Sequence, residues 1–431
     1  MPKSSYYPLK KGPAQSETSF WINLAAFVIA TGVLAFCRYT GMVRGTPLFM
    51  LFAAVITFSI ICLECVFYPK TCVYTKWRIR RTIRWQRVFY KEVTFLITVA
   101  IIGFFYWLLP AYDKNDDFIN EYLPFLKYLV PFMLLSSVPY FALMDKIDEE
   151  PDDVYYRIGD GILHFKKTVS RFELGNYARS WLVKAFWLSL MQPYMVNDIY
   201  WFLTVSWEKI KDTPAEWFWT ADSFCFFIDL AYASTGYLVN LKILNSQTRT
   251  AEPTLFGWIV AVMCYWPFWG ILFYPYFFDY DRVGWMSVFQ TGSVMWWTWF
   301  ALIIFLEFMY SMATIAAGIR FSNLTYRGLW NTGPYKYTKH PAYVYKNISW
   351  WLIAMPFMAT GWQTALKLSL LLLGNNLIYY WRAKTEERHL SHYPEYVTYA
   401  LEMNKKSIFR RLARVLPFLK YKAPTAKERI F

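Results

Sequence analysis

Charged residues are scarce in this chain of 431 residues, of which only 17% are Asp, Glu, Lys or Arg. A soluble globular domain carries about a quarter. The shortfall excludes an ordinary soluble fold, and 56% of the residues are hydrophobic, among them 22 Trp. Apolar runs of about twenty residues recur along the whole length, which is what a helix needs to cross a bilayer. The sequence therefore predicts an all-α, polytopic membrane helical bundle.

We interpret ten of these runs as transmembrane helices. They cover residues 20–37, 46–68, 93–110, 125–144, 182–205, 217–238, 255–277, 288–316, 343–359 and 362–381. Pro193 and Pro356 interrupt two runs, and a bundle tolerates kinked helices of this kind. Residues 1–19 are polar, so no cleavable signal peptide is expected before the first run.

The basic residues cluster in particular loops. The loop at 69–92 holds eight Lys or Arg residues, whereas the loop at 111–124 holds four acidic residues against Lys114 alone. With a cytoplasmic N-terminus, ten spans place 69–92, 317–342 and the basic tail on the inside, as the positive-inside rule requires. Both termini are therefore predicted to be cytoplasmic. The net charge of +15 then reflects this bias and attraction to anionic lipid, and no nucleic-acid partner is expected.

The chain divides into four parts by composition. Residues 1–144 contain the N-terminal spans with the basic loop, 145–181 form a polar cytoplasmic insert, 182–254 contain the middle spans, and 255–431 contain the C-terminal spans and a basic tail. No internal repeat is visible.

Cysteine and acidic residues inside the spans give weaker signals. Cys62 and Cys65 have the spacing of a redox or zinc pair, but no second pair exists and both lie in an apolar run. They are interpreted as buried hydrophobic residues, and no metal site is predicted. Asp222 and Asp229 are seven residues apart and share a helix face. They are either satisfied by neighbouring Tyr, Trp or Lys side chains or line a proton or ion pathway.

Histidine is rarer still, with four residues, and three of them lie in or just after two polar segments near the C-terminus. The first segment, 333–343, reads GPYKYTKHPAY. Pro341 is typical of a first helical residue, so Lys339, His340 and the free amides of that helix start would together suit a carboxylate or phosphate.

The second segment, 381–390, reads WRAKTEERHL. Its residues Arg382, Glu386 and Leu390, with Tyr393 just beyond, are spaced to share one face of a helix that leaves the membrane. Glu386 and Glu387 could hold an ammonium group or a ribose diol. A cationic and an anionic cradle together fit a zwitterion such as the amino-acid end of S-adenosylmethionine, whose sulfonium nearby aromatic rings would shelter.

The order and spacing of these residues resemble the integral-membrane methyltransferases of the isoprenylcysteine carboxyl methyltransferase type, including phospholipid methyltransferase relatives. The matching residues, within about 320–415, are Gly333, Tyr335, Lys339, His340, Pro341, Tyr343, Arg382, Glu386, Glu387, Leu390, Tyr396 and Tyr399. Lys339 departs from the usual Arg, and Tyr345 stands where Gly often follows. The additional N-terminal spans are absent from the smallest family members.

The resemblance implies a cytoplasm-facing pocket for S-adenosylmethionine that opens sideways to the bilayer for a lipid or isoprenoid-like acceptor. By the same resemblance, Arg382 and Glu386 would be catalytic, with Arg382 positioning the acceptor. The cofactor would be bound by Tyr335, Lys339, His340, Pro341, Tyr343, Glu386, Glu387 and Leu390. A carboxylate acceptor needs no base, whereas an amine or hydroxyl would need Glu386 or His389 to take a proton.

Two other classes of function stay open. An NADPH-dependent membrane reductase of the sterol C14-reductase type also has about ten spans and an Arg-His-x-x-Tyr segment, but usually carries Arg-Asp where this chain has Glu386 and Glu387. A transporter or non-catalytic scaffold would instead use the intramembrane Asp residues. The acceptor, the methylated atom, the membrane and the oligomeric state are not determined by the sequence.

Overall fold

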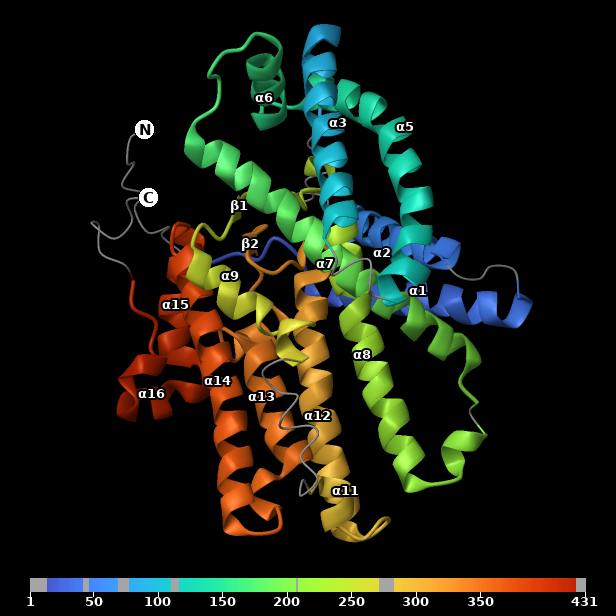
Figure 1. The fold of residues 1–431 in the computed structure, drawn as a ribbon, viewed down its shortest axis with the longest axis vertical. Coiled ribbons are helices and arrows are strands. Elements are labelled where there is room, and N and C mark those ends of the chain that lie inside the picture. The colour runs from blue at the N-terminus through green and yellow to red at the C-terminus, as the bar shows by residue number, and fades with distance from the viewer. Residues whose placement is uncertain are drawn as a thin grey trace. The chain divides into compact units, whose positions relative to one another are not determined.

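The computed structural model describes residues 14–41, 46–68, 77–109, 116–206, 208–270 and 283–423. Their regular secondary structure is almost entirely helical, so the predicted all-α class is confirmed (Figure 1). The two strands found there, β1 (Thr250–Ala251) and β2 (Thr325–Tyr326), have two residues each. The chain forms two compact units, one from residues 25–203 and 233–251, the other from 1–24, 204–232 and 252–431.

The first unit, which we call the N-terminal unit, holds most of α1 and the helices up to α7. Their bounds are α1 (Phe20–Thr40), α2 (Thr46–Phe67), α3 (Trp85–Leu108), the π-helical turn η2 (Phe118–Tyr122), α5 (Leu123–Ile147), α6 (Val154–Leu163) and α7 (Arg171–Thr204), with the 3-10 turn η4 (Lys242–Leu244).

The second unit, the C-terminal unit, holds most of α8 and everything after residue 252. Its helices are α8 (Pro214–Leu238), α9 (Leu255–Val262), α11 (Trp285–Val288), α12 (Val294–Ala317), α13 (Pro341–Ala354), α14 (Trp362–Leu390), α15 (Pro394–Lys406) and α16 (Leu412–Val415). Its 3-10 turns are η3 (Lys209–Lys211), η5 (Gly318–Arg320), η6 (Gly333–Lys336), η7 (Pro356–Met358), η8 (Ile408–Arg410) and η9 (Pro417–Leu419).

Five helical segments within the described residues are long and apolar enough to cross a membrane. They are Phe20–Thr40, Thr46–Phe67, Trp85–Leu108, Phe118–Ile147 and Val294–Arg320, and they overlap the first four predicted spans and the eighth. The fifth, sixth and tenth predicted spans lie in the long helices α7, α8 and α14. The number ten and the sides of the termini stay predictions.

Two predicted spans are wrong as continuous helices. The seventh, 255–277, begins as α9 but that helix ends at Val262, and residues 271–282 lie outside the described part. The ninth, 343–359, corresponds to α13, which ends at Ala354 because Met355 is left-handed (φ +39°) and Pro356 follows. Its 14 residues are about 21 Å long, short of the roughly 30 Å of a bilayer core.

In the N-terminal unit, two buried cations of α3 have acidic partners at the end of α5 and just before α6. Arg87 contacts Asp145 through Nη1 and Asp152 through Nε, both at 2.7 Å. Lys91 Nζ lies 2.8 Å from Asp153. Asp145 and Lys91 have no exposed surface. Buried ions are tolerated when paired in this way, and the network fixes α6 against α3.

In the C-terminal unit, α12, α13 and α14 lie side by side (Figure 1). Two of the acids predicted to lie within the membrane have hydrogen-bond partners: Asp229 accepts from Tyr310 (2.6 Å) and Thr314, and Glu307 accepts from Ser349 (2.5 Å). Of the two alternatives predicted for Asp229, the structure favours hydrogen-bonding neighbours over a proton or ion pathway. Asp222 is half-buried on the same helix.

Candidate active site

The first polar segment is shaped by its glycine and its proline. Gly333 has φ +57°, and a Cβ there would approach the Phe20 ring to 2.6 Å, so only glycine fits the start of η6. Pro341 is the first residue of α13 and His340 precedes it as the N-cap. The predicted helix start at His340–Pro341 is confirmed.

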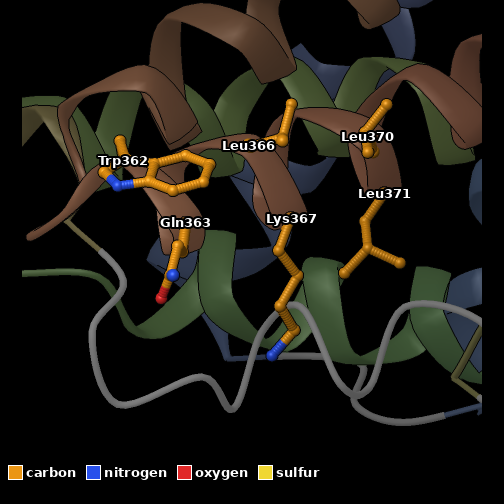
Figure 2. Close-up of a pocket in the computed structure, with 6 residues that line it drawn as sticks. All are labelled: Trp362, Gln363, Leu366, Lys367, Leu370 and Leu371. Atoms are coloured by element: carbon orange, nitrogen blue, oxygen red, sulfur yellow. The ribbon is translucent and has the colours of Figure 1, made fainter.

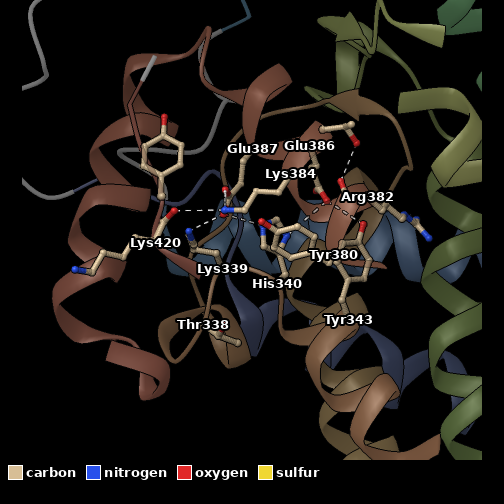
Figure 3. A network of polar contacts seen from close by, with 12 residues as sticks. Thr338, Lys339, His340, Tyr343, Tyr380, Arg382, Lys384, Glu386, Glu387 and Lys420 are labelled. Carbon is tan, nitrogen blue, oxygen red and sulfur yellow. Dashed lines mark hydrogen bonds and ion pairs between the residues drawn. The ribbon is translucent and has the colours of Figure 1, made fainter. Parts of the chain in front are cut away.

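The second polar segment continues α14 without a break, so the helix carries its charges from Arg382 to Leu390. The two segments meet, because residues just before α13 contact residues in the last three turns of α14 (Figure 3). One predicted neighbour is misplaced. Tyr393 does not share the helix face of Arg382 and Glu386, since α14 ends at Leu390 and Tyr393 precedes α15.

Glu387 is the buried centre of a network of cations (Figure 3). Its Oε1 lies 2.6 Å from Lys339 Nζ and 3.4 Å from His340 Nε2, while its Oε2 accepts a 2.8 Å hydrogen bond from Lys384. Burial alone would raise the pKa of Glu387, but the hydrogen bond with His340 and the charges of both lysines hold that pKa well below its ordinary value. Glu387 is therefore an anion with its oxygens fully engaged.

Lys339 experiences the opposite balance within the same network. Burial lowers the pKa of the Lys339 ammonium, and the attraction of Glu387 offsets this only in part. Its ammonium also lies 5.3 Å from the centre of the Tyr421 ring. Lys339, which stands where the resemblance led us to expect Arg, is thus committed to Glu387.

Glu386 points to different partners from its neighbour Glu387. Tyr343 Oη donates a 2.9 Å hydrogen bond to Glu386 Oε2, and His340 Nδ1 lies 3.6 Å from the same oxygen. The His340 and Tyr343 rings stack 5.5 Å apart and nearly parallel. The Glu386 side chain is 40% exposed. One carboxylate of the adjacent pair is therefore accessible to a ligand and the other is enclosed by lysines.

Arg382 is buried, with 7% of its surface exposed, and has no carboxylate within ion-pair distance among the described residues. Its guanidinium donates to Asn323 Oδ1 and, at 3.4 Å, to Tyr265 Oη. It lies over the rings of Tyr343 (4.9 Å), Tyr265 (5.4 Å) and Tyr379 (5.9 Å). Arg382 and Glu386, one helical turn apart, do not neutralise each other.

The remaining predicted cofactor residues lie against the core of α15. Tyr335 and Leu390 pack on the cluster of Leu329, Tyr396, Val397, Tyr399, Ala400, Met403 and Tyr421. Tyr399 Oη donates to the backbone oxygen of Tyr335 at 2.8 Å. These two residues support the segment that carries His340, and their side chains belong to that apolar cluster.

Residues 420–421 bring in partners that the sequence did not indicate. Tyr421 exchanges two backbone hydrogen bonds with the Asn404 side chain (2.8 and 3.0 Å), and its hydroxyl lies 2.6 Å from Ser391 Oγ. Lys384 Nζ also contacts the backbone oxygen of Lys420 at 3.4 Å. The chain after α16 is thereby fastened beside the Glu387 network.

A separate open groove of about 500 Å³ lies on the first half of α14 (Figure 2). It is lined by Trp362, Gln363, Leu366, Lys367, Leu370 and Leu371. About 16 Å of helix separates Leu371 from Arg382. The groove is an apolar helix surface in a chain with membrane-spanning helices and is not part of the charged site.

The site thus combines a buried cation with a half-exposed carboxylate, in a unit that contains a helix apolar enough to span a membrane. Residues 299–392 match the model of the isoprenylcysteine carboxyl methyltransferase (ICMT) family, so this C-terminal segment is similar to a family of membrane methyltransferases. The match extends from α12 to just beyond α14 and confirms the resemblance predicted from the two polar segments. Searches among curated proteins and solved structures gave no match.

Proposed function

We propose that the protein is an integral-membrane, S-adenosylmethionine-dependent methyltransferase that acts on a lipidic or membrane-embedded acceptor from the cytoplasmic face. The family match supports methyl transfer. The observation that carries the rest is the separation of charge on α14. Among the residues that the structure describes, no carboxylate pairs with the buried Arg382, and no cation lies closer to the half-exposed Glu386 than His340.

The residues present fit the ammonium and sulfonium groups of S-adenosylmethionine. Glu386, with Tyr343 donating to it, would hold the ammonium group, and the stacked rings of His340 and Tyr343 would lie beside the sulfonium. S-adenosylmethionine, when bound, supplies an electrophilic methyl group. The contribution of the chain is to align the partners and to exclude water.

Arg382 would hold the acceptor. A guanidinium that is buried among tyrosine rings and one amide lacks only an anion, and a carboxylate or phosphate fits its fork of donors. If the acceptor atom carries a proton, Glu386, one helical turn from Arg382 on α14, is the candidate base. His389 is buried 3.9 Å from Glu252 on a different side of α14, which makes it the weaker candidate.

The competing reductase function needs cations for a nucleotide phosphate. Lys339 and Lys384 are both bound to Glu387, so Arg382 is the one cation of the described site left for such a phosphate, which makes the reductase the weaker candidate.

The thermal midpoint of the purified protein separates the two functions. S-adenosylmethionine should raise it and NADPH should not. Glu386→Gln should remove the shift, whereas Glu402→Gln, the same change at a half-exposed site on α15, should keep it. A shift with NADPH alone, or one that survives in Glu386→Gln, would contradict the proposal.

A further inference from the structure

The turn between α6 and α7, in the N-terminal unit, exposes apolar and basic side chains side by side. We call its exposed residues Leu163, Phe165, Lys166, Lys167, Arg171 and Phe172 the insert tip. Phe165 is 97% exposed and Phe172 is 53% exposed. Apolar surface with a polar rim marks a site of interaction, and the methyltransferase site makes no use of this one.

The backbone holds Phe165 in its exposed position. Phe165 has φ +52°, in the left-handed region that bulky side chains rarely adopt. The amide of Lys166 donates to the oxygen of Gly161 (3.0 Å), and the amide of His164 donates to that of Asp160 (3.0 Å). This is a helix end at which glycine usually occupies the place of Phe165. A strained phenylalanine with its ring in solvent indicates a function outside packing.

The insert tip is anchored on both sides. Gly159 of α6 packs so closely on α3 that a Cβ would lie 2.1 Å from the oxygen of Tyr90. At the start of α7, Glu173 accepts from the amide and hydroxyl of Ser170 (3.1 and 2.8 Å), and Ser170 Oγ accepts from the amide of Glu173 (3.2 Å). This is a capping box. Phe165 is thus presented by a defined turn.

Contacts with α3 place the insert tip at one end of a candidate membrane span. The His164 ring meets the Tyr90 ring edge-on at 5.7 Å. Beside Tyr90, α3 exposes Trp85 and Phe89, and further along it exposes Leu96, Ile97 and Ile101. Exposed aromatic residues at the end of an apolar helix are typical of the membrane–water interface. The contact of His164 with Tyr90 therefore puts Phe165 beside the end of α3 at which a membrane-spanning α3 would meet the interface.

The cations of the insert tip are available for a partner. Lys166, Lys167 and Arg171 form no ion pair among the described residues, whereas the nearby Arg157 is paired with Glu173 at 2.7 Å. Basic side chains that flank exposed aromatic residues are the composition of a surface that binds an anionic bilayer. Charge and apolar exposure together favour lipid.

We propose that the insert tip is an anchor for the anionic membrane surface, with the Phe165 ring inserted among the lipids and the three cations on the headgroups. The test uses the full-length protein in lipid nanodiscs, with Phe165→Cys carrying a nitroxide label. In phosphatidylcholine with phosphatidylserine, the label should be accessible to oxygen and shielded from a water-soluble nickel chelate. In phosphatidylcholine alone the shielding should decrease.

Matched variants make the outcome decisive. Glu150→Cys, an exposed position before α6, should be open to the chelate in both lipid mixtures, and the unsubstituted protein labelled in parallel corrects for its own cysteines. Lys166→Glu with Lys167→Glu should abolish the phosphatidylserine dependence, whereas Lys209→Glu with Lys211→Glu, an equal charge change in η3, should keep it. A label at 165 as open to the chelate as one at 150 in both mixtures overturns the proposal.

Phe165→Gly tests the same idea without a label. Glycine adopts the left-handed conformation without strain, so the variant should be at least as stable in detergent. It should lose the gain in thermal midpoint that phosphatidylserine gives the unsubstituted protein. A loss of stability in detergent would show that the ring is a packing element, and the proposal would fail.

Discussion

Two buried arginines, one in each compact unit, have opposite surroundings. Arg87 lies between the carboxylates of Asp145 and Asp152, whereas Arg382 is surrounded by an amide, a phenol and three tyrosine rings with no carboxylate in reach among the described residues. A paired buried ion fixes helices together. An unpaired one costs free energy in the free protein, so its presence indicates a ligand that completes it.

Substitution of Arg87 should have the largest effect on the free energy of unfolding. Arg87→Met leaves the fully buried Asp145 without its cation and should lower the free energy of unfolding by about 4 kcal/mol. Denaturant unfolding in detergent measures it. Arg80→Met, which breaks an exposed pair with Glu149, should cost only about 0.5 kcal/mol. Equal losses of unfolding free energy in the two variants would contradict the view that the buried ion pair contributes more to stability than the exposed one.

A substitution of Glu387 tests whether the C-terminal unit also contains a buried ion that is stabilised by oppositely charged partners, as Arg87 is in the N-terminal unit. Glu387→Gln strands Lys339 and Lys384 and should cost about 3 kcal/mol at neutral pH. Because the pKa of Glu387 is lowered by folding, this stabilisation is complete above its ordinary value of about 4.5. It is lost as the pH falls from there toward the folded-state pKa.

The measurement compares the unfolding free energies of the unsubstituted protein and Glu387→Gln at neutral pH and at increasingly acid pH. The gap between them should stay constant down to about pH 4.5 and then close. A gap that closes already near neutral pH would mean that Glu387 is not held as a buried anion.

Short sequence patterns predicted those features of the site that are determined by residues adjacent in the sequence. Pro341 identified the start of α13, and the spacing of Arg382 and Glu386 identified one face of α14. The charges of the two polar segments also placed them together. Each of these features is fixed within a few residues by backbone sterics or by helical periodicity.

The partners of Arg382 could not be found in this way. Asn323 lies 59 positions away and Tyr265 lies 117 away, and no pattern in a single sequence links them. Hydropathy also failed where the backbone departs from a helix. The run at 343–359 is apolar on average, yet α13 stops before the left-handed Met355, which an average over a window does not detect.

Tyr343 should show a smaller effect that reports on both sides of the site. Tyr343→Phe removes the hydrogen bond to Glu386 and should cost about 1 kcal/mol of stability. It should weaken S-adenosylmethionine binding about tenfold, since a hydrogen bond to a charged group contributes about 1.5 kcal/mol. Calorimetric titration measures the affinity. An unchanged affinity would place the cofactor away from Glu386.

Arg382→Met should have the smallest effect on stability and a large one on activity. The measurement that tests the account most directly is transfer of labelled methyl from S-adenosylmethionine into a membrane lipid extract, with unfolding measured on the same samples. We predict that Arg382→Met unfolds like the unsubstituted protein, because an apolar side chain replaces an unpaired buried charge, and that incorporation falls by about 100-fold. Undiminished incorporation, or a loss of stability as large as that of Arg87→Met, would contradict it.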